Sequence, residues 1–339
     1  MTDQTQRSFS FLLPLIRNRN FRLISIVILL TIIAGGISTV SILKKKHTND
    51  KDTIKTWKKN GITVVGGNRY DNELNQSSLI VDFYVDDDDN QTIYFSDFAR
   101  NRIVQWKAGA SSGQIFLDGN RFNLSIRNFI IDKDTHSIIF SDLVNRNVIR
   151  WSYANTTDRE ILLSNIKCTS LYIDKKRQIY IGDGENELIK IWKNKNDIEI
   201  IVIKDFIFNS QKRDFELVHL AIDRSASIYI STYRKHAIYQ LTKNSSNATV
   251  VAGENQLHSP EGIIFDDSDN LYIADAGNNR VICWEKGAKE GRVIVGGNGR
   301  GNHSDQFYWP THLSFDKYNN LYVVDFNNYR IQTFLLDSS

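Results

Sequence analysis

Six positions of this chain bring histidine, carboxylate and amide side chains to one repeated place in the sequence. Each lies four residues before an acid that ends a short apolar segment, and successive positions are 42 to 50 residues apart. Histidine and carboxylate are ligands that zinc accepts, whereas calcium takes oxygen ligands. If the fold gathers these side chains, they could form a metal or anion site; otherwise they form a polar lining that holds only water. The six residues are Asp82, Asn128, Ser170, His219, Gly262 and His312, and the positions just before two of them add Arg127 and Glu261.

Asp82 and His312 are the best candidates within this set for metal ligands. They stand in the first and last units of the repeat, so closure of the units into a ring would make them neighbours. A carboxylate with a neutral imidazole suits zinc better than calcium. His219 lies two units away from His312, which could be too far for a shared ion. Placing Asp82 in the set assumes a two-residue insertion in the turn at Asp86–Asp89. We expect no cofactor, with zinc or calcium as the alternative.

A second repeated position indicates which elements hold these side chains. A polar residue follows a short apolar strand six times, with spacings of 45, 41, 49, 43 and 50 residues. This period is typical of one four-stranded propeller blade or a similar all-β unit. Nine residues after each of these pivots comes a large apolar residue, which we expect to pack between blades. The pivots are Asp97, Asp142, Asp183, Thr232, Asp275 and Asp325, and the apolar residues are Trp106, Trp151, Trp192, Leu241, Trp284 and Phe334.

The repeat resembles the NHL family of β-propellers over about residues 60–339. The match is strong in the fifth and sixth copies and weak in the fourth, where Thr232 replaces the aspartate and no arginine follows. The resemblance implies a six-bladed propeller, in which first strands line a central channel and the six ring positions surround its mouth. It also implies an Asp–Arg contact across the turn after the pivot. Arg102, Arg280 and Arg330 occupy that arginine position, so the contact should be looser in blades two, three and four.

The two ends of the repeat region predict how the ring closes. The chain ends soon after the third strand of the sixth copy, so that blade lacks an outer strand of its own. The segment Gly61–Gly67 carries the outer-strand pattern but stands before the first blade. We therefore predict that Val64 and Val65 pair with the strand Ile331–Phe334, which leaves no open sheet edge at the seam.

A long apolar run precedes the propeller. Residues 23–43 carry no charge and are mostly Ile, Leu and Val, which is enough to cross a bilayer as one helix. The run is long for the apolar part of a cleaved signal peptide, so we predict a retained anchor, although cleavage near Gly36–Ser38 stays open. The predicted organisation is a short cytoplasmic segment at 1–22, a transmembrane helix at 23–43, a polar stalk at 44–59 and the propeller at 60–339.

Two signals disagree about the orientation of this span. Lysine and arginine are more numerous after it, which by itself would place the propeller in the cytoplasm. All Asn-x-Ser/Thr acceptors also follow it, and long domains translocate largely regardless of charge. We therefore expect a single-pass membrane protein with an extracellular or lumenal propeller. The glycosylation candidates are Asn75, Asn90, Asn123, Asn155, Asn244, Asn247 and Asn302.

Charge and cysteine content exclude some classes of protein. Residues 1–59 hold 11 Lys and Arg against 3 Asp and Glu, which leaves 31 basic and 36 acidic residues in the propeller, a net charge of −5. Some NHL propellers bind RNA on a basic face, so an acidic propeller behind a membrane span predicts no nucleic-acid partner. The two cysteines, Cys168 and Cys283, exclude a disulfide-stapled scaffold and are too far apart in the repeat to pair.

The sequence carries no strong catalytic motif. We therefore predict a non-catalytic, membrane-anchored module that binds a protein, peptide or glycan through the loops Gly66–Ser78, Phe206–Phe215 and Gly296–Trp309. The alternative is a metal-dependent lyase or hydrolase with its site in the channel. The lyase that completes peptide amidation resembles this fold and holds zinc with three histidines. Here only two histidines lie at ring positions, and His258 is offset from them.

Overall fold

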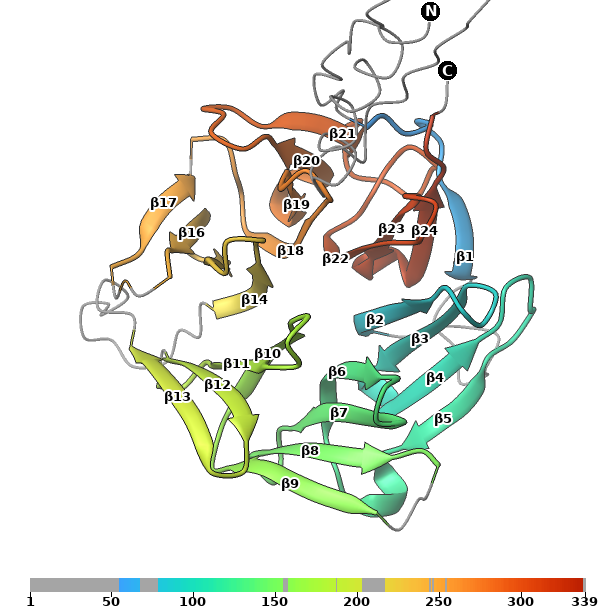
Figure 1. Cartoon of the computed structure of the whole chain (residues 1–339). Coiled ribbons are helices and arrows are strands. Elements are labelled where there is room, and N and C mark those ends of the chain that lie inside the picture. Colours follow the sequence, from blue (N-terminus) through green and yellow to red (C-terminus); the bar gives the residue numbers. More distant parts are fainter. Residues whose placement is uncertain are drawn as a thin grey trace, which may run out of the picture. The chain divides into compact units, whose positions relative to one another are not determined.

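Six four-stranded antiparallel sheets surround a central axis in a computed structural model of the chain (Figure 1). The structure describes residues 55–67, 79–154, 158–186, 188–202, 217–243, 245, 247–253 and 255–337. The sheets follow one another around the ring in chain order, and the inner strand of each packs against those of its neighbours. The predicted all-β, six-bladed propeller is therefore confirmed.

Each blade runs from an inner strand to an outer one through three antiparallel pairings. The inner strands are β2 (Ile80–Asp86), β6 (Ile126–Asp132), β10 (Cys168–Ile173), β14 (Leu217–Ile222), β18 (Pro260–Phe265) and β22 (Pro310–Phe315). The second strands are β3 (Thr92–Asp97), β7 (Ser137–Asp142), β11 (Ile179–Asp183), β15 (Ile228–Thr232), β19 (Leu271–Asp275) and β23 (Leu321–Asp325).

The two remaining strands of each blade lie farther from the axis. The third strands are β4 (Arg102–Trp106), β8 (Asn147–Ser152), β12 (Leu188–Asn194), β16 (Ala237–Leu241), β20 (Arg280–Trp284) and β24 (Arg330–Phe334). The outer strands are β5 (Gln114–Asp118), β9 (Arg159–Ser164), β13 (Asp197–Val202), β17 (Thr249–Ala252), β21 (Arg292–Gly296) and β1 (Ile62–Gly66).

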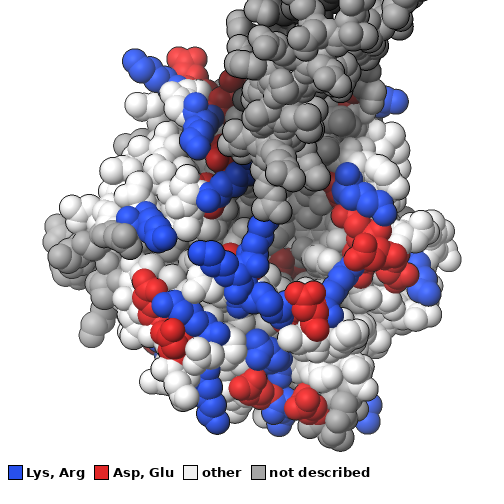
Figure 2. All heavy atoms as spheres, in the orientation of Figure 1, with Lys and Arg blue, Asp and Glu red and all other residues white. Residues whose placement is uncertain are grey.

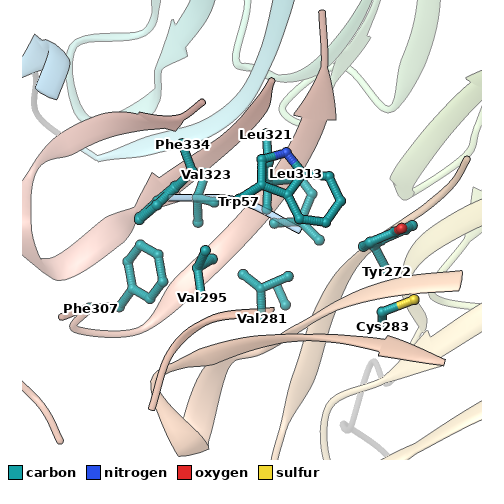
Figure 3. Packing of buried hydrophobic residues seen from close by; sticks show 11 residues of the cluster. Trp57, Tyr272, Val281, Cys283, Val295, Phe307, Leu313, Leu321, Val323 and Phe334 are labelled. Atoms are coloured by element: carbon teal, nitrogen blue, oxygen red, sulfur yellow. The ribbon is translucent and has the colours of Figure 1, made fainter. Parts of the chain in front are cut away.

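The hydrophobic core lies between adjacent blades. Apolar side chains on the facing surfaces of two sheets form one cluster per interface, because each short apolar strand is covered on both faces. Figure 3 shows the cluster between blades five and six, where Phe307 lies near Phe334 and Val295. All six large residues that follow the pivots are buried, which confirms their predicted core role: Trp106, Trp151, Trp192, Leu241, Trp284 and Phe334.

The turn between the second and third strands is held by the pivot aspartate in three blades. Arg102, Arg280 and Arg330 each direct Nε to the pivot carboxylate of their own blade, at 2.9, 2.7 and 2.8 Å. A short 3-10 turn follows each of these pivots: η2 (Phe98–Arg100), η5 (Ala276–Asn278) and η6 (Phe326–Asn328). A further such turn, η3 (Asn120–Phe122), joins blades one and two.

The other three blades replace this contact, as the missing arginines predicted. In blade two the Asn145 amide donates to the pivot carboxylate at 2.6 Å. In blade three Lys190 lies 3.1 Å from Asp183. In blade four the Thr232 hydroxyl donates to the Ala237 carbonyl at 2.9 Å. The turn is therefore kept with weaker or neutral partners.

The first strand of the propeller closes the ring. β1 pairs antiparallel with β24, and Val65 lies opposite Ile331, which confirms the predicted seam. The segment before it differs from the predicted polar stalk at its end. Trp57 is buried, stacks on Phe315 at 5.8 Å and donates from its indole N–H to the Asn319 carbonyl at 2.9 Å. Residues 55–59 thus belong to the propeller, because tryptophan fills a gap beside blade six (Figure 3).

Several predictions fall on residues that the structure does not describe. These are the segment 1–22, the span 23–43, the stalk up to residue 54, the loop Phe206–Phe215, most of Gly66–Ser78, and the acceptors Asn75, Asn155 and Asn244. Among the residues that are described, no helix is long and apolar enough to cross a membrane. The described acceptors Asn90, Asn123, Asn247 and Asn302 are all exposed. The two cysteines are buried and unpaired with each other.

Candidate functional site at the channel mouth

An irregularity in each inner strand positions the six ring residues. The pairing of every inner strand with its neighbour shifts by a residue or more at or next to the ring position, for example between Ile80 and Phe83 and between Pro260 and Ile263. Such a bulge bends the strand and redirects a side chain. We call the place where these strands begin the channel mouth, and define it by Asp82, Asn128, Ser170, His219, Gly262 and His312.

Two ring residues hold neighbouring blades together. An Asp82 carboxylate oxygen accepts the backbone N–H of Phe129 at 2.9 Å, and the Ser170 hydroxyl accepts that of Leu220 at 3.1 Å. Because these contacts are equivalent, they support the alignment of the copies. The assumed insertion is also present, since Asp86 pairs with Thr92 whereas Asp266 bonds the backbone of Asn270, two positions nearer.

Asp82, His312 and His219 form a chain of contacts across the mouth. Asp82 Oδ1 lies 3.4 Å from His312 Nε2, and His312 Nδ1 lies 2.9 Å from His219 Nε2. The first and last blades thus bring Asp82 and His312 together as closure predicted. The expectation that His219 is too far from His312 is not met, because the intervening blade has glycine at this position.

Gly262 is required where β18 passes β22. A Cβ atom there would lie 2.7 Å from the Thr311 carbonyl oxygen and 2.8 Å from the His312 Cα. Contacts this short do not occur without displacement of backbone, so no larger residue fits. The missing side chain also lets the His219 imidazole reach over blade five to His312, with ring centroids 4.2 Å apart.

Burial governs the charge of this chain. It raises the pKa of Asp82 to about 7 and lowers that of His219 to about 4, with the Arg127 charge adding to the second effect. It also lowers the pKa of His312 well below its ordinary value, with His219 contributing. Both histidines are therefore neutral near pH 7, while Asp82 is close to its midpoint. A neutral imidazole carries one hydrogen, so each ring donates on one side and accepts on the other.

The protonation of Asp82 determines which nitrogen of each histidine carries the hydrogen. With Asp82 ionised, His312 keeps its hydrogen on Nε2, which faces the carboxylate, accepts from His219 at Nδ1, and leaves His219 Nδ1 as a bare acceptor. One added proton on Asp82 can reverse the hydrogen bond between the two histidines and turn His219 Nδ1 into a donor. Nδ1 is buried and has no hydrogen-bond partner among the described residues. The chain can thus present either polarity to a ligand.

A second acidic group stands beside this chain. Glu261 accepts the indole N–H of Trp309 at 2.9 Å, and burial raises its pKa to about 7. Trp309 adopts a left-handed backbone conformation with φ of 65°, rare for a bulky residue. Asn279 fixes it by accepting its backbone N–H at 3.0 Å. Tyr233 lies next to Trp309, with ring centroids 6.0 Å apart.

Sequence reasoning missed Trp309 and Tyr233 as parts of the mouth. Trp309 appeared only as the end of the loop Gly296–Trp309, and Tyr233 follows the one pivot that is not an aspartate. A usable signal was present, because Trp309 stands three residues before a ring position and directly before Pro310. Thr311, next to His312, was also missed, and its hydroxyl is buried without a partner in the part of the chain described.

Both nitrogens of His312 face other side chains, Nε2 toward Asp82 and Nδ1 toward His219. Among the described residues, no group of three or more His, Cys, Asp or Glu side chains is placed to hold an ion. His258 does not join the ring. It packs against His236, with ring centroids 4.8 Å apart and the planes inclined at 59°, beside a groove of about 1110 Å³.

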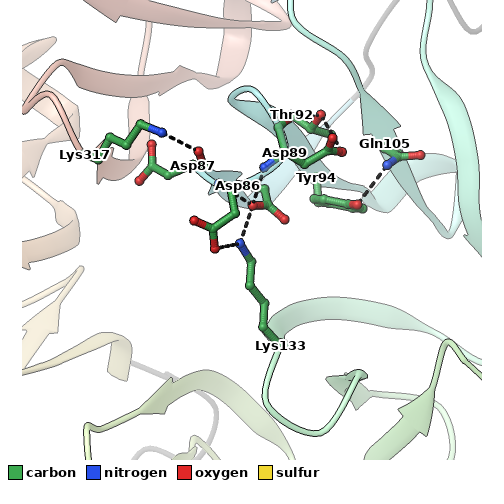
Figure 4. Close-up of polar contacts among 9 residues, drawn as sticks. Asp86, Asp87, Asp89, Thr92, Tyr94, Gln105, Lys133 and Lys317 are labelled. Carbon is green, nitrogen blue, oxygen red and sulfur yellow. Dashed lines mark hydrogen bonds and ion pairs between the residues drawn. The ribbon is translucent and has the colours of Figure 1, made fainter.

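The opposite end of the inner strands is built differently. Each inner strand ends at or next to an aspartate that accepts hydrogen bonds within the following turn, as Asp266 does from the backbone N–H of Ser268 and Asn270 at 2.8 and 3.0 Å. Figure 4 shows Lys133 of blade two directed at Asp86 of blade one, and Lys317 directed at Asp87. We call these residues the exit acids: Asp86, Asp132, Asp174, Asp223, Asp266 and Asp316.

Acidic and basic side chains are mixed on the surface as well. Figure 2 shows one face of the molecule, on which Lys and Arg lie beside Asp and Glu rather than in a patch of one sign. Ion pairs between side chains at the surface include Arg146–Glu185 and Lys193–Glu199.

Comparisons with known proteins show the fold and no more. No family model and no curated protein matches the sequence, so membership of the NHL family is not confirmed. A protein of unknown function from Bacteroides thetaiotaomicron has a TM-score of 0.64 at 13% identity, over 82% of this chain and 76% of that one. An auxiliary nutrient binding protein from the same organism has a TM-score of 0.64 at 14%, over 84% and 78%. A virginiamycin B lyase from Staphylococcus aureus has a TM-score of 0.53 at 10%, over 78% and 98%.

Proposed function

We propose that this protein is a non-catalytic binding module that takes a protein, peptide or glycan at the channel mouth. One observation carries the proposal. Three buried polar atoms of the mouth have no hydrogen-bond partner in the described chain: Asn128 Oδ1, His219 Nδ1 and Thr311 Oγ1. Buried polar groups are normally satisfied, so such a group calls for a partner from outside the chain.

The surroundings of the mouth suit a binding surface. Loops from outer to inner strands reach the same end of the blades at which the inner strands begin, and these are the long loops of the sequence. Within the described part of them, residues 296–309 place Trp309 at the mouth. The auxiliary nutrient binding protein shows that a propeller of this shape can serve binding, although its ligand is not carried over to this chain.

A direct test is binding of the purified full chain, kept in a mild detergent, to peptide and glycan arrays. The variant His219→Ala should weaken any specific signal, because it removes an unpartnered group of the mouth. Lys133→Ala, at the opposite end of the inner strands, is the matched control and should leave the signal unchanged. Equal binding by the parent and both variants would move the ligand away from the mouth and contradict the proposal.

A second candidate is an enzyme of the lyase or hydrolase type in the channel. The Asp82–His312–His219 chain favours it, because a carboxylate that orients a histidine is an arrangement used in general acid–base catalysis. A metal-dependent version requires His312 to release one neighbour. Elemental analysis of the purified full chain distinguishes the candidates: stoichiometric zinc or calcium, lost in His312→Ala, would favour the enzyme.

Attachment to a membrane and glycosylation are proposed with the function. The apolar run 23–43 and the acceptors that follow it support a single-pass protein with the propeller outside the cytoplasm. Expression in a glycosylating cell should then give a mobility shift that glycosidase removes and that substitution of Asn90, Asn155 and Asn244 by Gln reduces. Absence of any shift, with the propeller protected from external protease, would place it in the cytosol. The mixed surface charge supports the absence of a nucleic-acid partner.

A further inference from the structure

The channel mouth contains a cation with no direct counter-ion. Arg127 lies in the bulge of β6, is half-buried, and forms no ion pair or hydrogen bond with any residue in the described ranges. Arg127 precedes Asn128 and Phe129 in this bulge, and the Phe129 N–H bonds Asp82, so the arginine lies at the channel mouth. Its charge opposes the burial that raises the pKa of Asp82 and Glu261, and adds to the lowering of the pKa of His219.

Two further polar groups of the mouth have no partner among the described residues. They are the buried Thr311 hydroxyl, on the residue before His312 in the bulge of β22, and Nδ1 of His219, whose ring contacts His312. His219 Nδ1 becomes a donor when Asp82 is protonated, because His312 then donates from Nδ1 to His219 Nε2. A cation with two neutral donors matches an oxyanion, because the ligand's charge is balanced and its lone pairs are occupied.

We propose that the mouth binds a carboxylate group of the ligand, which Arg127 pairs with and which His219 and Thr311 hydrogen-bond. The inference rests on the proposed binding function and specifies its ligand class. A single negative charge fits better than a phosphate dianion, because Asp82 and Glu261 stand nearby and would repel a second charge. A divalent cation is disfavoured by the Arg127 charge at the same place.

The aromatic side chains at the mouth narrow the class further. Trp309 bonds Glu261, and Tyr233 lies next to Trp309 and is 37% exposed, so an aromatic or sugar ring of the ligand can pack on them. Two sources supply this chemistry: the C-terminal residue of a peptide when it is aromatic, and an acidic sugar. Both present a carboxylate attached to a carbon that bears, or is part of, a flat or ring-shaped group.

Calorimetric titration of the full chain in mild detergent distinguishes these sources. The probes are N-acetyl-tryptophan, its amide, glucuronate and glucose. We expect at least one acid to bind at least tenfold more tightly than its uncharged counterpart, since the pairs differ in the carboxylate. Preference for the tryptophan acid indicates a peptide end, and preference for glucuronate indicates an acidic glycan. Equal affinity within both pairs, or no binding of either acid, overturns the inference.

Variants connect the result to Arg127. Arg127→Met should reduce the affinity of the acid probe at least tenfold and leave the affinity of the uncharged probe unchanged. Arg127→Lys keeps the charge but loses the planar guanidinium. Its affinity for the acid probe should lie between that of the parent and that of Arg127→Met. Arg224→Met, whose exposed side chain pairs with Asp267 at the other end of the inner strands, is the control. If Arg127→Met does not fold, Arg127→Lys is the test. An affinity for the acid probe equal to that of the parent would contradict a bidentate contact between the Arg127 guanidinium and the ligand carboxylate.

The two proposals fail in different ways. If the arrays bind through the mouth but no acid probe binds, the carboxylate inference is wrong and the binding function stands. If neither the arrays nor the acid probes show binding that His219→Ala weakens, the binding function and the carboxylate inference are both wrong.

Discussion

The two ends of the inner strands differ in their polar residues and in how these residues are paired. At the exit, all six blades carry aspartate, and each aspartate caps its own turn or pairs with a neighbouring blade. At the mouth, the six blades carry five residue types, and several polar atoms lack partners in the described chain. In a repeat protein, a position that stays the same in every copy supports what the copies share, which is the blade. A position that varies among the copies is free to form a site.

Charge states sharpen this contrast. Burial alone would raise the pKa of the exit acid Asp132, but hydrogen bonds from Arg177 and Thr135 outweigh it, and the pKa lies below its ordinary value. Burial raises the pKa of Asp82 to about 7, and its hydrogen bonds do not outweigh that effect. Contacts at the exit therefore stabilise the ionised form of Asp132, whereas burial at the mouth disfavours the ionised form of Asp82.

The largest expected effect comes from removing an exit acid. Asp266→Ala leaves the N–H groups of Ser268 and Asn270 and the Tyr272 hydroxyl without their acceptor. We expect the free energy of unfolding to fall by about 3 kcal/mol, because each buried donor left unpaired costs about 1–3 kcal/mol. Urea denaturation measures it, with Asp266→Asn as the control that keeps one acceptor. A loss below about 1 kcal/mol would show that the exit acids do not support the blades.

A smaller loss is expected from filling the glycine of the mouth. Gly262→Ala places a methyl group within 2.8 Å of the backbone of β22 and should cost about 2 kcal/mol through overpacking. It should also push His219 away from His312. Thermal unfolding measures the first effect, and the imidazole resonances in an NMR spectrum report the second. Gly253→Ala, whose nearest neighbour would be 3.6 Å away, is the matched control.

The two ends should also respond to pH with opposite sign. The folded-state pKa of Asp82 is raised to about 7, so the folded protein binds more protons than the unfolded chain between pH ~4 and 7, and stability falls as pH rises through that window. For Asp132 the folded pKa is depressed, so its contribution is present above the unfolded value near pH ~4 and is lost as pH falls.

Isosteric variants separate these contributions. Near pH 8, Asp82→Asn should raise the free energy of unfolding by about 1–2 kcal/mol, and Asp132→Asn should lower it by about 1 kcal/mol. Denaturation at pH 5 and pH 8 measures both. The same sign of change for the two variants at pH 8 would remove the contrast between mouth and exit.

The smallest effect separates binding from stability most clearly. Thr311→Val removes a buried hydroxyl that has no partner in the described residues and keeps the shape of the side chain. Stability should be unchanged or rise by up to about 1 kcal/mol, because the polar group no longer costs desolvation. Affinity for the acid probe should fall severalfold in the same variant. A clear loss of stability would mean that Thr311 supports the fold rather than the site.

The fold was predictable because the same short strand pattern recurs six times in the sequence. The pivots fixed the blades, and the outer-strand pattern at Gly61–Gly67 predicted the seam between β1 and β24. Trp57 was assigned to the stalk because lysines surround it, although only tertiary packing decides where one tryptophan goes. The six ring positions were predictable from the repeat, but their contacts and the neighbouring Trp309, Tyr233 and Thr311 were not. The contact between His219 and His312 depends on Gly262, and a missing side chain is a weak signal in a sequence.

The seam has a consequence for how the protein is made. Trp57 and Asn319, which bond each other beside the seam, are 262 residues apart, nearly the whole length of the propeller. At roughly 5–20 residues per second, a ribosome needs roughly 13 to 50 s to produce the second after the first. During that time the strand Ile62–Gly66 has no partner, and its Val64 and Val65 are open to other chains. An unpaired strand edge can pair with other chains. Protection of this strand until β24 is made, rather than the folding of the blades, would then limit the yield of closed protein.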